Sequence, residues 1–470
     1  MRILTTILTT VLIALVCNGH IHARTWHIER DGSGDFIWIQ PAVELAADGD
    51  TILIGPGRYP EYWTVTDEYG QVWDFYVEVK HDSLTFIGAG KDATIIGPED
   101  PEVNQNLALG FTGLDYSLLR ISNLCIENIN YEGVYFRDGR LEMDACQVRN
   151  SYSGIVVEIG GGGLITGCHF EEIDEEAIVS FPPTIDFEAR DCSFNNCEAG
   201  FSFNWGSQNC RVIDCEFTGG VLGCGFSDGS SGEVRGCTIT GTQNYGIGCH
   251  LSGAVVIENN YIDQDTGWGI AFVSPEHVGG SGNIVISNAN CLDFGSRADL
   301  DFHGNHFLRG PSGYFARTTD YWPYSPYHVD LTDNYWGTYD LEEIATWIFD
   351  GYDSDVVNLY LDYEPISGPV VGVDEPGIPE ALSFRVFPNP FNPSTQIHFT
   401  LTASRQVNLD IFDLLGRRIA VLANRHFESG EHTFTWYGRD DDGHLVPSGT
   451  YLIRMEAEDY VETQKIMLVR

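Results

Sequence analysis

The sequence predicts an all-β protein: a long solenoid of short strands with a helix capping each end, followed by a small C-terminal β-sandwich. Three observations lead to this fold class. Cysteine and then asparagine residues recur about every 22 positions, and a second apolar motif follows each of the earlier ones by eight or nine residues. A helical pattern at 39–47 stands alone, because no pattern of comparable strength returns until Leu341.

Residues 1–23 have the composition of a signal peptide. Arg2 precedes an apolar run from Ile7 to Val16, and we expect cleavage after Ala23. Cys17 offers a lipoprotein alternative, but the three residues before it form a poor lipobox. No other run is long and apolar enough to span a bilayer, so we expect an exported chain without a transmembrane segment. With 470 residues, it can hold one large and one small domain.

The chain is strongly acidic, and the acidity is uneven. It contains 68 Asp and Glu residues against 25 Lys and Arg residues, a formal net charge of −43. Residues 381–470 hold 11 acidic and 9 basic side chains, so nearly all of the excess lies before them. Such a surface repels nucleic acid and other polyanions and attracts divalent cations. We therefore expect no nucleic-acid partner and no required cofactor. Asp31 and Asp35, or Asp299 and Asp301, are candidate calcium ligands; the alternative is that these acidic turns are ordinary solvated loops.

The first predicted element is a short amphipathic helix at 39–47. Ile39, Ala42, Val43 and Ala46 recur at helical spacing, and Gly49 suits the C-terminal end. A single helix ahead of a long non-helical stretch is what a solenoid needs at its first coil, because an uncovered strand edge invites aggregation.

The repeat itself occupies the centre of the chain. Each marker cysteine is followed two residues later by an apolar side chain, except that Glu127 breaks the rule once. Asparagine then replaces cysteine. A period near 22 residues with short strands indicates coils that build a core only by stacking. The markers are Cys125, Cys146, Cys168, Cys192, Cys215, Cys237, Asn260, Asn290, Asn305 and Asn334.

Cysteines at one position of successive coils should stack as small buried apolar groups. Adjacent Cα atoms would lie within disulfide reach, but parallel Cβ directions give poor disulfide torsions. We therefore expect free thiols although the chain is exported.

A second helix is predicted after Asp340. Leu341, Ile344, Ala345 and Ile348 recur at helical spacing, and Asp340 with Glu343 forms a capping box. This helix would cover the last coil.

Three stretches together resemble a known family: "DGSGDF…IQPAV…AADGDTILIGPGRYPE", "LTFIGAGKDATIIGP" and "NYWGT…EEI…IFDG". They are similar to secreted right-handed parallel β-helix proteins of the pectin-lyase-like superfamily. The resemblance implies a right-handed parallel β-helix over residues 24–364. It implies no single activity, because that superfamily contains lyases, hydrolases, esterases and proteins of unknown role.

The alternation of the second motif predicts two exposed rows along one face. Four polar residues in these rows are candidate glycan-binding residues: Arg137, Glu158, Asn204 and His250. Aromatic loops at 62–76, with Tyr62 and Trp63, and at 313–327 suit stacking on sugar rings. From the second loop Tyr321 and Trp322 are further candidates. The alternative is that these loops fold onto the solenoid and bury their rings.

These rows are sparse for catalysis, and the signature motifs of pectate lyases, polygalacturonases and pectin methylesterases are absent from the sequence. We therefore predict a secreted or cell-surface protein that contacts glycans or another extracellular surface. The alternative is a polysaccharide lyase or glycoside hydrolase whose acid and base lie in loops. Neutral glycans suit the acidic surface better than polyuronates.

Residues 365–382 form a Pro- and Gly-rich linker, and residues 383–470 alternate like the strands of a small β-sandwich. "FPNPFNPST", "IFDLLGRRI" and "GRDDDGHLVPSGTYLIR" closely resemble the immunoglobulin-like sorting domain of the type IX secretion system. This resemblance implies a partnership with that machinery. It also implies localisation outside the cell or on the outer surface of a Gram-negative-type bacterium. A plain adhesive sandwich is the alternative.

Overall fold

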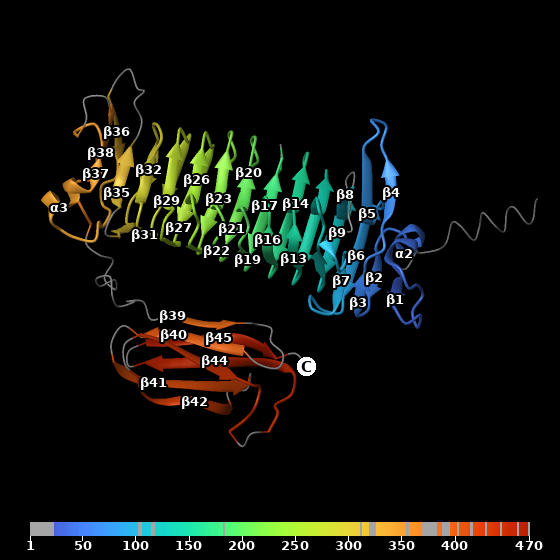
Figure 1. Cartoon of the computed structure of the whole chain (residues 1–470). Coiled ribbons are helices and arrows are strands. Elements are labelled where there is room, and N and C mark those ends of the chain that lie inside the picture. Colours follow the sequence, from blue (N-terminus) through green and yellow to red (C-terminus); the bar gives the residue numbers. More distant parts are fainter. Residues whose placement is uncertain are drawn as a thin grey trace, which may run out of the picture. The chain divides into compact units, whose positions relative to one another are not determined.

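The computed structural model divides the chain into two compact units, Met1–Ser367 and Gly368–Arg470 (Figure 1). The first 22 residues of the predicted signal peptide and most of the predicted linker lie outside the described residues. The structure describes residues 23–101, 106–113, 118–181, 184–310, 313–318, 326–353, 357–367, 383–387, 395–401, 404–413, 417–427, 430–441, 444–457 and 460–468.

The first unit is a parallel β-helix whose coils each contribute strands to three long sheets. Sheet A contains β1 (Thr25–Ile28), β2 (Asp50–Ile54), β6 (Ser83–Gly88), β9 (Leu118–Ser122), β12 (Arg140–Asp144), β15 (Gly162–Thr166), β18 (Phe187–Arg190), β21 (Cys210–Ile213), β24 (Gly232–Arg235), β27 (Ala254–Glu258), β30 (His277–Gly280) and β33 (Leu300–Phe302). Sheet B contains β3 (Gly57–Tyr59), β7 (Thr94–Ile96), β10 (Cys125–Glu127), β13 (Gln147–Ser151), β16 (His169–Ile173), β19 (Ser193–Asn195), β22 (Glu216–Thr218), β25 (Thr238–Thr240), β28 (Tyr261–Gln264), β31 (Ile284–Ser287) and β34 (His306–Arg309).

Sheet C runs along the third face and carries the rows predicted above. It contains β4 (Trp63–Thr66), β5 (Val72–Val79), β8 (Leu107–Gly113), β11 (Glu132–Arg137), β14 (Ser153–Glu158), β17 (Glu176–Ser180), β20 (Ala199–Phe203), β23 (Leu222–Ser227), β26 (Tyr245–His250), β29 (Trp268–Val273), β32 (Asn290–Phe294), β35 (Tyr314–Thr318) and β37 (Ile348–Phe349). Its strands pair in parallel, except that β4 returns antiparallel to β5 as a hairpin. A separate parallel pair, β36 (Tyr327–Asp330) and β38 (Leu359–Asp362), follows near the last coils.

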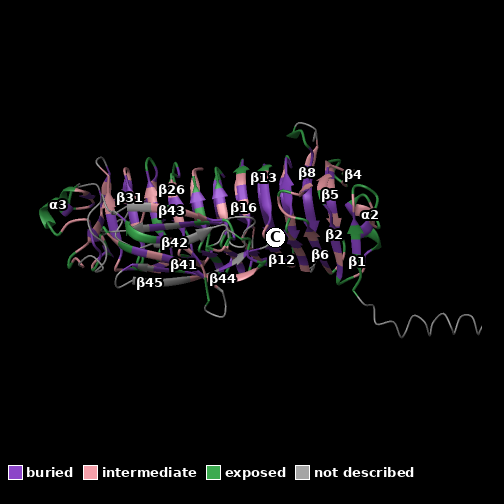
Figure 2. Ribbon diagram, turned by 90° about the horizontal axis from the view of Figure 1, so that it is seen from below, coloured by how far each residue is buried: buried purple, intermediate pink, exposed green. Residues whose placement is uncertain are grey.

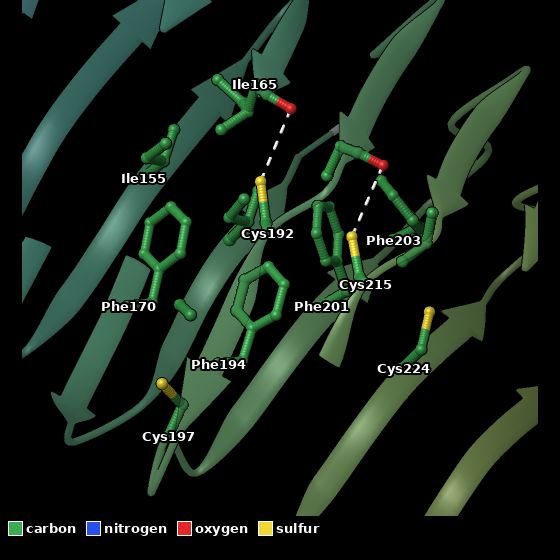
Figure 3. Close-up of a cluster of buried hydrophobic side chains, with 14 of the residues drawn as sticks. Ile155, Ile165, Phe170, Cys192, Phe194, Cys197, Phe201, Phe203, Cys215 and Cys224 are labelled. Atoms are coloured by element: carbon green, nitrogen blue, oxygen red, sulfur yellow. Dashed lines mark hydrogen bonds between the residues drawn. The ribbon is translucent and has the colours of Figure 1, made fainter. Parts of the chain in front are cut away.

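The core is formed by side chains that repeat at one position of each coil. On sheet B the register aligns Phe170, Phe194 and Phe217, and their rings stack at centroid distances of 5.0 and 4.6 Å (Figure 3). A single coil is too thin to bury its own apolar side chains, so the stacking of successive coils supplies this burial. Figure 2 shows buried residues along the strands of every coil.

The cysteine column is confirmed with two corrections. Pairing of Cys125 with Gln147 places Leu124, not Cys125, beneath Cys146. This explains the broken rule at Glu127, because the inward apolar residue of that coil is Ile126. In the later coils Asn283 occupies the column, whereas Asn290 lies on β32 of sheet C.

The side chains of the column are buried and hydrogen-bonded. The Cys192 thiol donates to the carbonyl oxygens of Arg190 at 3.2 Å and of Ile165 at 3.6 Å (Figure 3). The eleven cysteines among the described residues are free and buried, as the sequence predicted. Burial raises the pKa of Cys249 and of Cys291 to about 12, which keeps these thiols neutral.

Both predicted cap helices are present. Helix α2 (Ile39–Leu45) buries Ile39, Ala42 and Val43 against the first coils. Helix α3 (Leu341–Thr346) begins at Asp340, whose carboxylate accepts hydrogen bonds from the backbone N–H groups of Glu342 and Glu343. α3 is shorter than predicted: Ile348 starts β37 instead, and of the four apolar residues only Ile344 and Ile348 are buried.

The second unit is a small β-sandwich. One sheet is formed by β39 (Ser383–Phe387), β40 (Thr395–Leu401) and β43 (Gly430–Trp436). The other is formed by β42 (Arg418–Phe427), β41 (Arg405–Asp413), β44 (Gly449–Ala457) and β45 (Tyr460–Leu468). All pairings are antiparallel, and the unit has a hydrophobic core of its own that includes Ile411, Trp436 and Ile453. None of the helices in the described part of the chain is both long and apolar enough to cross a membrane.

Candidate functional site

The outer face of sheet C carries the candidate site. Its register confirms the alignment of the two predicted rows: Tyr135 aligns with Val156 and Val179, and Ser227 aligns with His250 and Val273. The prediction that both rows are exposed is wrong for part of the first row, because the neighbouring side chains bury Val156 and Val179. Between β17 and β26 this face is hollowed into an open groove of about 330 Å³.

The floor of the groove is made of small residues. In the first row, the bulky Tyr135 and Val156 of the early coils give way to Ser202, Gly225 and Gly248. A Cβ atom at Gly248 would lie 3.6 Å from the His250 ring and 3.8 Å from the Leu222 side chain, whereas a Cβ atom at Gly225 would lie 2.9 Å from Leu222. The hollow therefore comes from small residues in this row, with the Leu222 side chain lying over Gly225.

Two of the predicted site residues line this groove. Asn204 follows β20, and its side-chain oxygen accepts a hydrogen bond from the Ser227 hydroxyl at 2.7 Å. His250 ends β26 with its ring 5.6 Å from the ring of Tyr245. Burial lowers the pKa of His250, so its imidazole is neutral at neutral pH and can accept or donate a hydrogen bond.

One wall of the groove is acidic. Glu175, Glu176 and Glu198 line it together with Tyr245, and the hydroxyl of Tyr152 donates to the Glu175 carboxylate at 3.0 Å. Burial raises the pKa of Glu176, and the neighbouring Glu175 and Glu198 raise it further. The wall therefore repels anions while Glu176 is biased towards the neutral carboxylic acid, which can donate a hydrogen bond.

Arg137 and Glu158 lie outside this groove, on the neighbouring coils of the same face. They are aligned at the ends of β11 and β14, but the Glu158 carboxylate accepts a hydrogen bond from the Tyr135 hydroxyl at 2.6 Å. Burial and the charge of Glu158 raise the pKa of Glu132, on the same strand as Tyr135, to about 8. Tyr321 and Trp322 lie outside the described residues.

Sequence reasoning missed the acidic wall and Tyr245. These residues stand at or just before the start of the second motif. Glu198 is one coil after Glu175 and Glu176, and Tyr245 is two coils further on; the pairing of Glu176 with Ala199, of Ala199 with Leu222 and of Leu222 with Tyr245 puts these positions on one line. The spacing was available in the sequence, but the motif alone did not show that its first residue faces outwards.

The turn after sheet C carries a second missed feature. Ile159, Trp205 and Leu251 are exposed and have positive φ angles of 37°, 50° and 51°. Bulky side chains rarely adopt this conformation. Trp205 directly follows Asn204 and is 52% exposed, with its ring 5.4 Å from that of Phe181. An aromatic surface thus adjoins the groove.

The acidic turns proposed for calcium contain carboxylates that have protein partners. Asp35 pairs with Arg24 at 3.4 Å, and Asp299 pairs with His277 at 3.2 Å. Among the described residues, no three His, Cys, Asp or Glu side chains converge as a metal site. Calcium binding stays a prediction, to be tested by adding calcium to chelator-treated protein and measuring its melting temperature.

Comparisons with known proteins agree with this architecture. A family described as "Right handed beta helix region" matches residues 114–227 and 188–307, which supports the predicted hand of the coils. A family described as "FlgD Ig-like domain" matches residues 391–460, within the C-terminal sandwich. No curated protein matches the chain.

Several solved structures are similar at low identity. PorZ, a surface component of the type IX secretion system of Porphyromonas gingivalis, is 21% identical over 19% of this chain, with a TM-score of 0.15. PorU of the same organism is 18% identical over 21% of this chain, with a TM-score of 0.18. The matches span only 12% and 10% of those two proteins. An alginate lyase from Paenibacillus is 14% identical over 62% of this chain and 97% of its own, with a TM-score of 0.40.

Proposed function

We propose that this β-helix protein acts outside the cell or on its surface and binds neutral glycans along the outer face of sheet C. The groove between β17 and β26 is the observation that carries the proposal. It offers hydrogen-bonding groups that are uncharged or biased towards the neutral form on Asn204, His250 and Glu176, and aromatic rings on Tyr245 and the adjoining Trp205. Hydroxyl-rich rings with an apolar face suit such a surface.

The charge of the groove selects against acidic glycans. Its lining carboxyl groups belong to Glu175, Glu176 and Glu198, and the described residues that line it include no Lys or Arg. A polyuronate would have to approach these carboxylates within a chain whose formal net charge is −43. A longer neutral glycan that extends beyond the groove would reach Glu158 at the end of β14 and then Arg137 at the end of β11. We therefore assign these two residues to contacts with the part of the glycan outside the groove.

Binding to a panel of glycans tests the proposal. Isothermal titration with maltohexaose, cellohexaose, laminarihexaose and oligogalacturonate should show binding of at least one neutral member and none of the acidic one. Gly248→Val should weaken that binding at least tenfold by filling the floor, since the β-branched Val156 occupies the same row in another coil. Thr238→Ala, on the outer face of sheet B, serves as the control. Binding of the acidic member alone, or unchanged binding by the Gly248 variant, would contradict the proposal.

A polysaccharide lyase or glycoside hydrolase is the second candidate. One observation favours it: Glu176 and His250 line the same groove, and burial shifts their pKa values in opposite directions. Groups shifted in this way are suited to general acid and base roles. Assays for new reducing ends and for unsaturated products over the same panel decide between binding and turnover. Turnover that is lost in both Glu176→Gln and His250→Ala would establish the enzyme.

We further propose that the C-terminal sandwich is the export domain of the chain. Its motifs resemble type IX sorting domains, and the Ig-like family match covers residues 391–460 of the same unit. The last strand, β45, pairs along the whole of β44 and contributes Ile466 and Leu468 to the core. Deleting only residues 461–470 would therefore unfold the sandwich as well as remove the strand that would contact the secretion machinery.

Removal of the whole unit gives a cleaner test of export. A chain ending at Ser367 should keep its β-helix but accumulate in the periplasm of a host with type IX secretion, whereas the full chain reaches the surface or medium. Fractionation and immunoblotting distinguish these locations. Normal secretion of the shortened chain would exclude the sorting role and leave the adhesive sandwich as the alternative.

A further inference from the structure

A second pocket lies at the N-terminal end of the β-helix, outside the groove. It has a volume of about 460 Å³ and is formed by the start of α2 and by the segment that leads from β3 into the β4–β5 hairpin. Its aromatic lining includes Trp38, Tyr62, Trp63 and Tyr76. Volumes of this size and aromatic linings are typical of small-ligand sites.

The rings of this pocket are partly exposed and held in place. Trp38 is 49% exposed and Tyr62 is 40% exposed. The ring of Tyr62 lies 5.6 Å from that of the buried Tyr76, and the ring of Trp63 stacks on Phe75 at 5.9 Å. These contacts orient the rings of Tyr62 and Trp63 before any ligand arrives, which reduces the entropy lost on binding.

The hairpin that carries Tyr62 and Trp63 is anchored by polar contacts. The Thr64 hydroxyl donates to the buried Asp74 carboxylate at 2.7 Å, and the side-chain amide of Asn106 donates to both of its oxygens at 3.2 Å. Trp38 occupies the residue before α2, where its side chain makes no capping hydrogen bond. A polar residue would stabilise the helix better at this position, so capping does not account for the half-exposed tryptophan there.

The charges of the pocket disfavour an anionic ligand. Glu44 and Glu61 are the charged residues of its described lining, and Glu61 is paired with the Arg30 guanidinium. The described lining offers no basic side chain to receive an anion. Aromatic faces also attract ammonium groups, so a cation is the competing ligand and is tested below with choline.

We propose that this pocket is a second carbohydrate subsite, in which one ring of a neutral saccharide stacks on Trp38 and Tyr62 while its hydroxyl groups bond to Glu44. The pocket and its aromatic lining are independent of the groove; the assignment of a saccharide, rather than another uncharged apolar ligand, rests on the proposed function.

The two sites lie on one sheet, which predicts avidity. From β5, beside the pocket, to β20, inside the groove, there are five strand steps in sheet C. At about 4.8 Å per step this separates them by ~24 Å along the helix axis. A neutral glycan long enough to span that distance should bind more tightly than short fragments, because engagement of the second site becomes intramolecular.

Titration of the full chain with a short and a long form of one glycan tests the inference. For the trisaccharide form of the neutral glycan that binds best, which is too short to reach both sites, we expect two sites per chain, one lost in Trp38→Ala and the other in Gly248→Val. The parent polysaccharide should bind at least tenfold more tightly than the trisaccharide, and either variant should abolish that gain. Trp38→Phe, which keeps an aromatic face, should restore binding, and Leu45→Ala, on the exposed side of α2, is the matched control.

Each result separates this inference from the proposed function. One site per chain, lost only in Gly248→Val, would overturn the N-terminal subsite and leave the groove intact. One site lost only in Trp38→Ala would support the subsite and overturn the groove. Choline serves as the cationic probe, and choline binding that Trp38→Ala removes would overturn the saccharide assignment. Failure of every neutral glycan to bind would overturn both proposals.

Discussion

Each asparagine of the buried column bonds to the coils on both sides of it. The side-chain N–H₂ group of Asn283 donates to the carbonyl of Ile257 and to the side-chain oxygen of Asn305, both at 2.7 Å. Its own oxygen accepts from the backbone and side-chain N–H groups of Asn260. Cysteine occupies the same position in earlier coils, where its sulfur makes weaker hydrogen bonds. The two residue types therefore fill the same buried position but contribute different hydrogen-bond energies to stability.

Asn283→Ala should therefore lower the free energy of unfolding by about 2–4 kcal/mol, because it leaves several buried backbone and amide groups without partners. Urea unfolding followed by circular dichroism measures the loss. Cys215→Ala, at the matched position of an earlier coil, should cost only about 1 kcal/mol, since it removes one small thiol. Equal losses for the two variants would show that the amide contacts add nothing.

Glu132 makes stability depend on pH. Burial and the charge of Glu158 raise its pKa from 4.5 to about 8 in the folded chain. A carboxyl whose pKa is raised by folding stabilises the fold fully below the unfolded pKa, and that stability is lost as pH rises through the folded pKa. The window therefore runs from pH 4.5 to about 8.

Glu132→Gln should flatten the pH dependence of stability across this window and raise the free energy of unfolding at pH 8 by a few kcal/mol at most. Urea titrations at pH 5 and pH 8 measure the difference. Glu44→Gln, on an exposed side chain, controls for the loss of one charge. A Glu132 variant with the same pH profile as the natural chain would show that the carboxyl is ionised in the fold.

At the scale of elements, the caps and the turns set the limits of the β-helix. α2 covers the first coils through three buried side chains and leaves its other face in solvent. Many turns between sheets contain a residue with a positive φ angle. Between sheets A and B this residue is mainly Asn, Asp or Gly, as at Asn123, Asp191 and Gly236. The turn after sheet C departs from this choice with Ile159, Trp205 and Leu251, and this departure adjoins the candidate site.

Val43→Asp should uncover the first coil. Val43 is 1% exposed, so a carboxylate there costs a few kcal/mol, displaces α2 and exposes the strand edges beneath it. Light scattering coupled to size-exclusion chromatography should show aggregates. Leu45→Asp makes the same chemical change on the exposed side of the same helix and should remain monomeric. A monomeric Val43 variant of unchanged stability would argue that α2 does not protect the edge.

At the scale of the whole molecule, the chain consists of two units of different character. The β-helix unit carries nearly all of the negative excess, whereas residues 381–470 are close to neutral. Each unit has its own hydrophobic core, and the two cores share no residue among those described. Units with separate cores are expected to fold separately.

Calorimetry should therefore show two unfolding transitions. A chain that ends at Ser367 should retain the transition of the β-helix and lose the other, with little change in the remaining melting temperature. Because high net charge destabilises a compact chain through self-repulsion, added salt should raise the β-helix transition more than that of the sandwich. A single cooperative transition that the truncation shifts by many degrees would show that the units stabilise each other.

Much of the fold was predictable because its rules are local. The 22-residue spacing, the alternation of the second motif and the isolated helix at 39–47 each follow from short-range patterns, and stacking in register converts them into sheets. The errors were also local: Cys125 and Asn290 were each assigned to the column by residue type, although Leu124 and Asn283 occupy it. Residue type alone does not reveal an offset of one position, as between Leu124 and Cys125, or of seven positions, as between Asn283 and Asn290.

The sequence by itself determined the solenoid, its caps, the free thiols and the C-terminal sandwich, and it identified the face on which Asn204 and His250 lie. Only the tertiary structure decided that these two meet Glu176 and Tyr245 in one groove, while Arg137 and Glu158 do not. A groove depends on where neighbouring coils carry small residues, such as Gly225 and Gly248, and on which side chains lie next to those positions. Those neighbours are some 22 residues apart along the chain, so their volumes combine only when the coils stack.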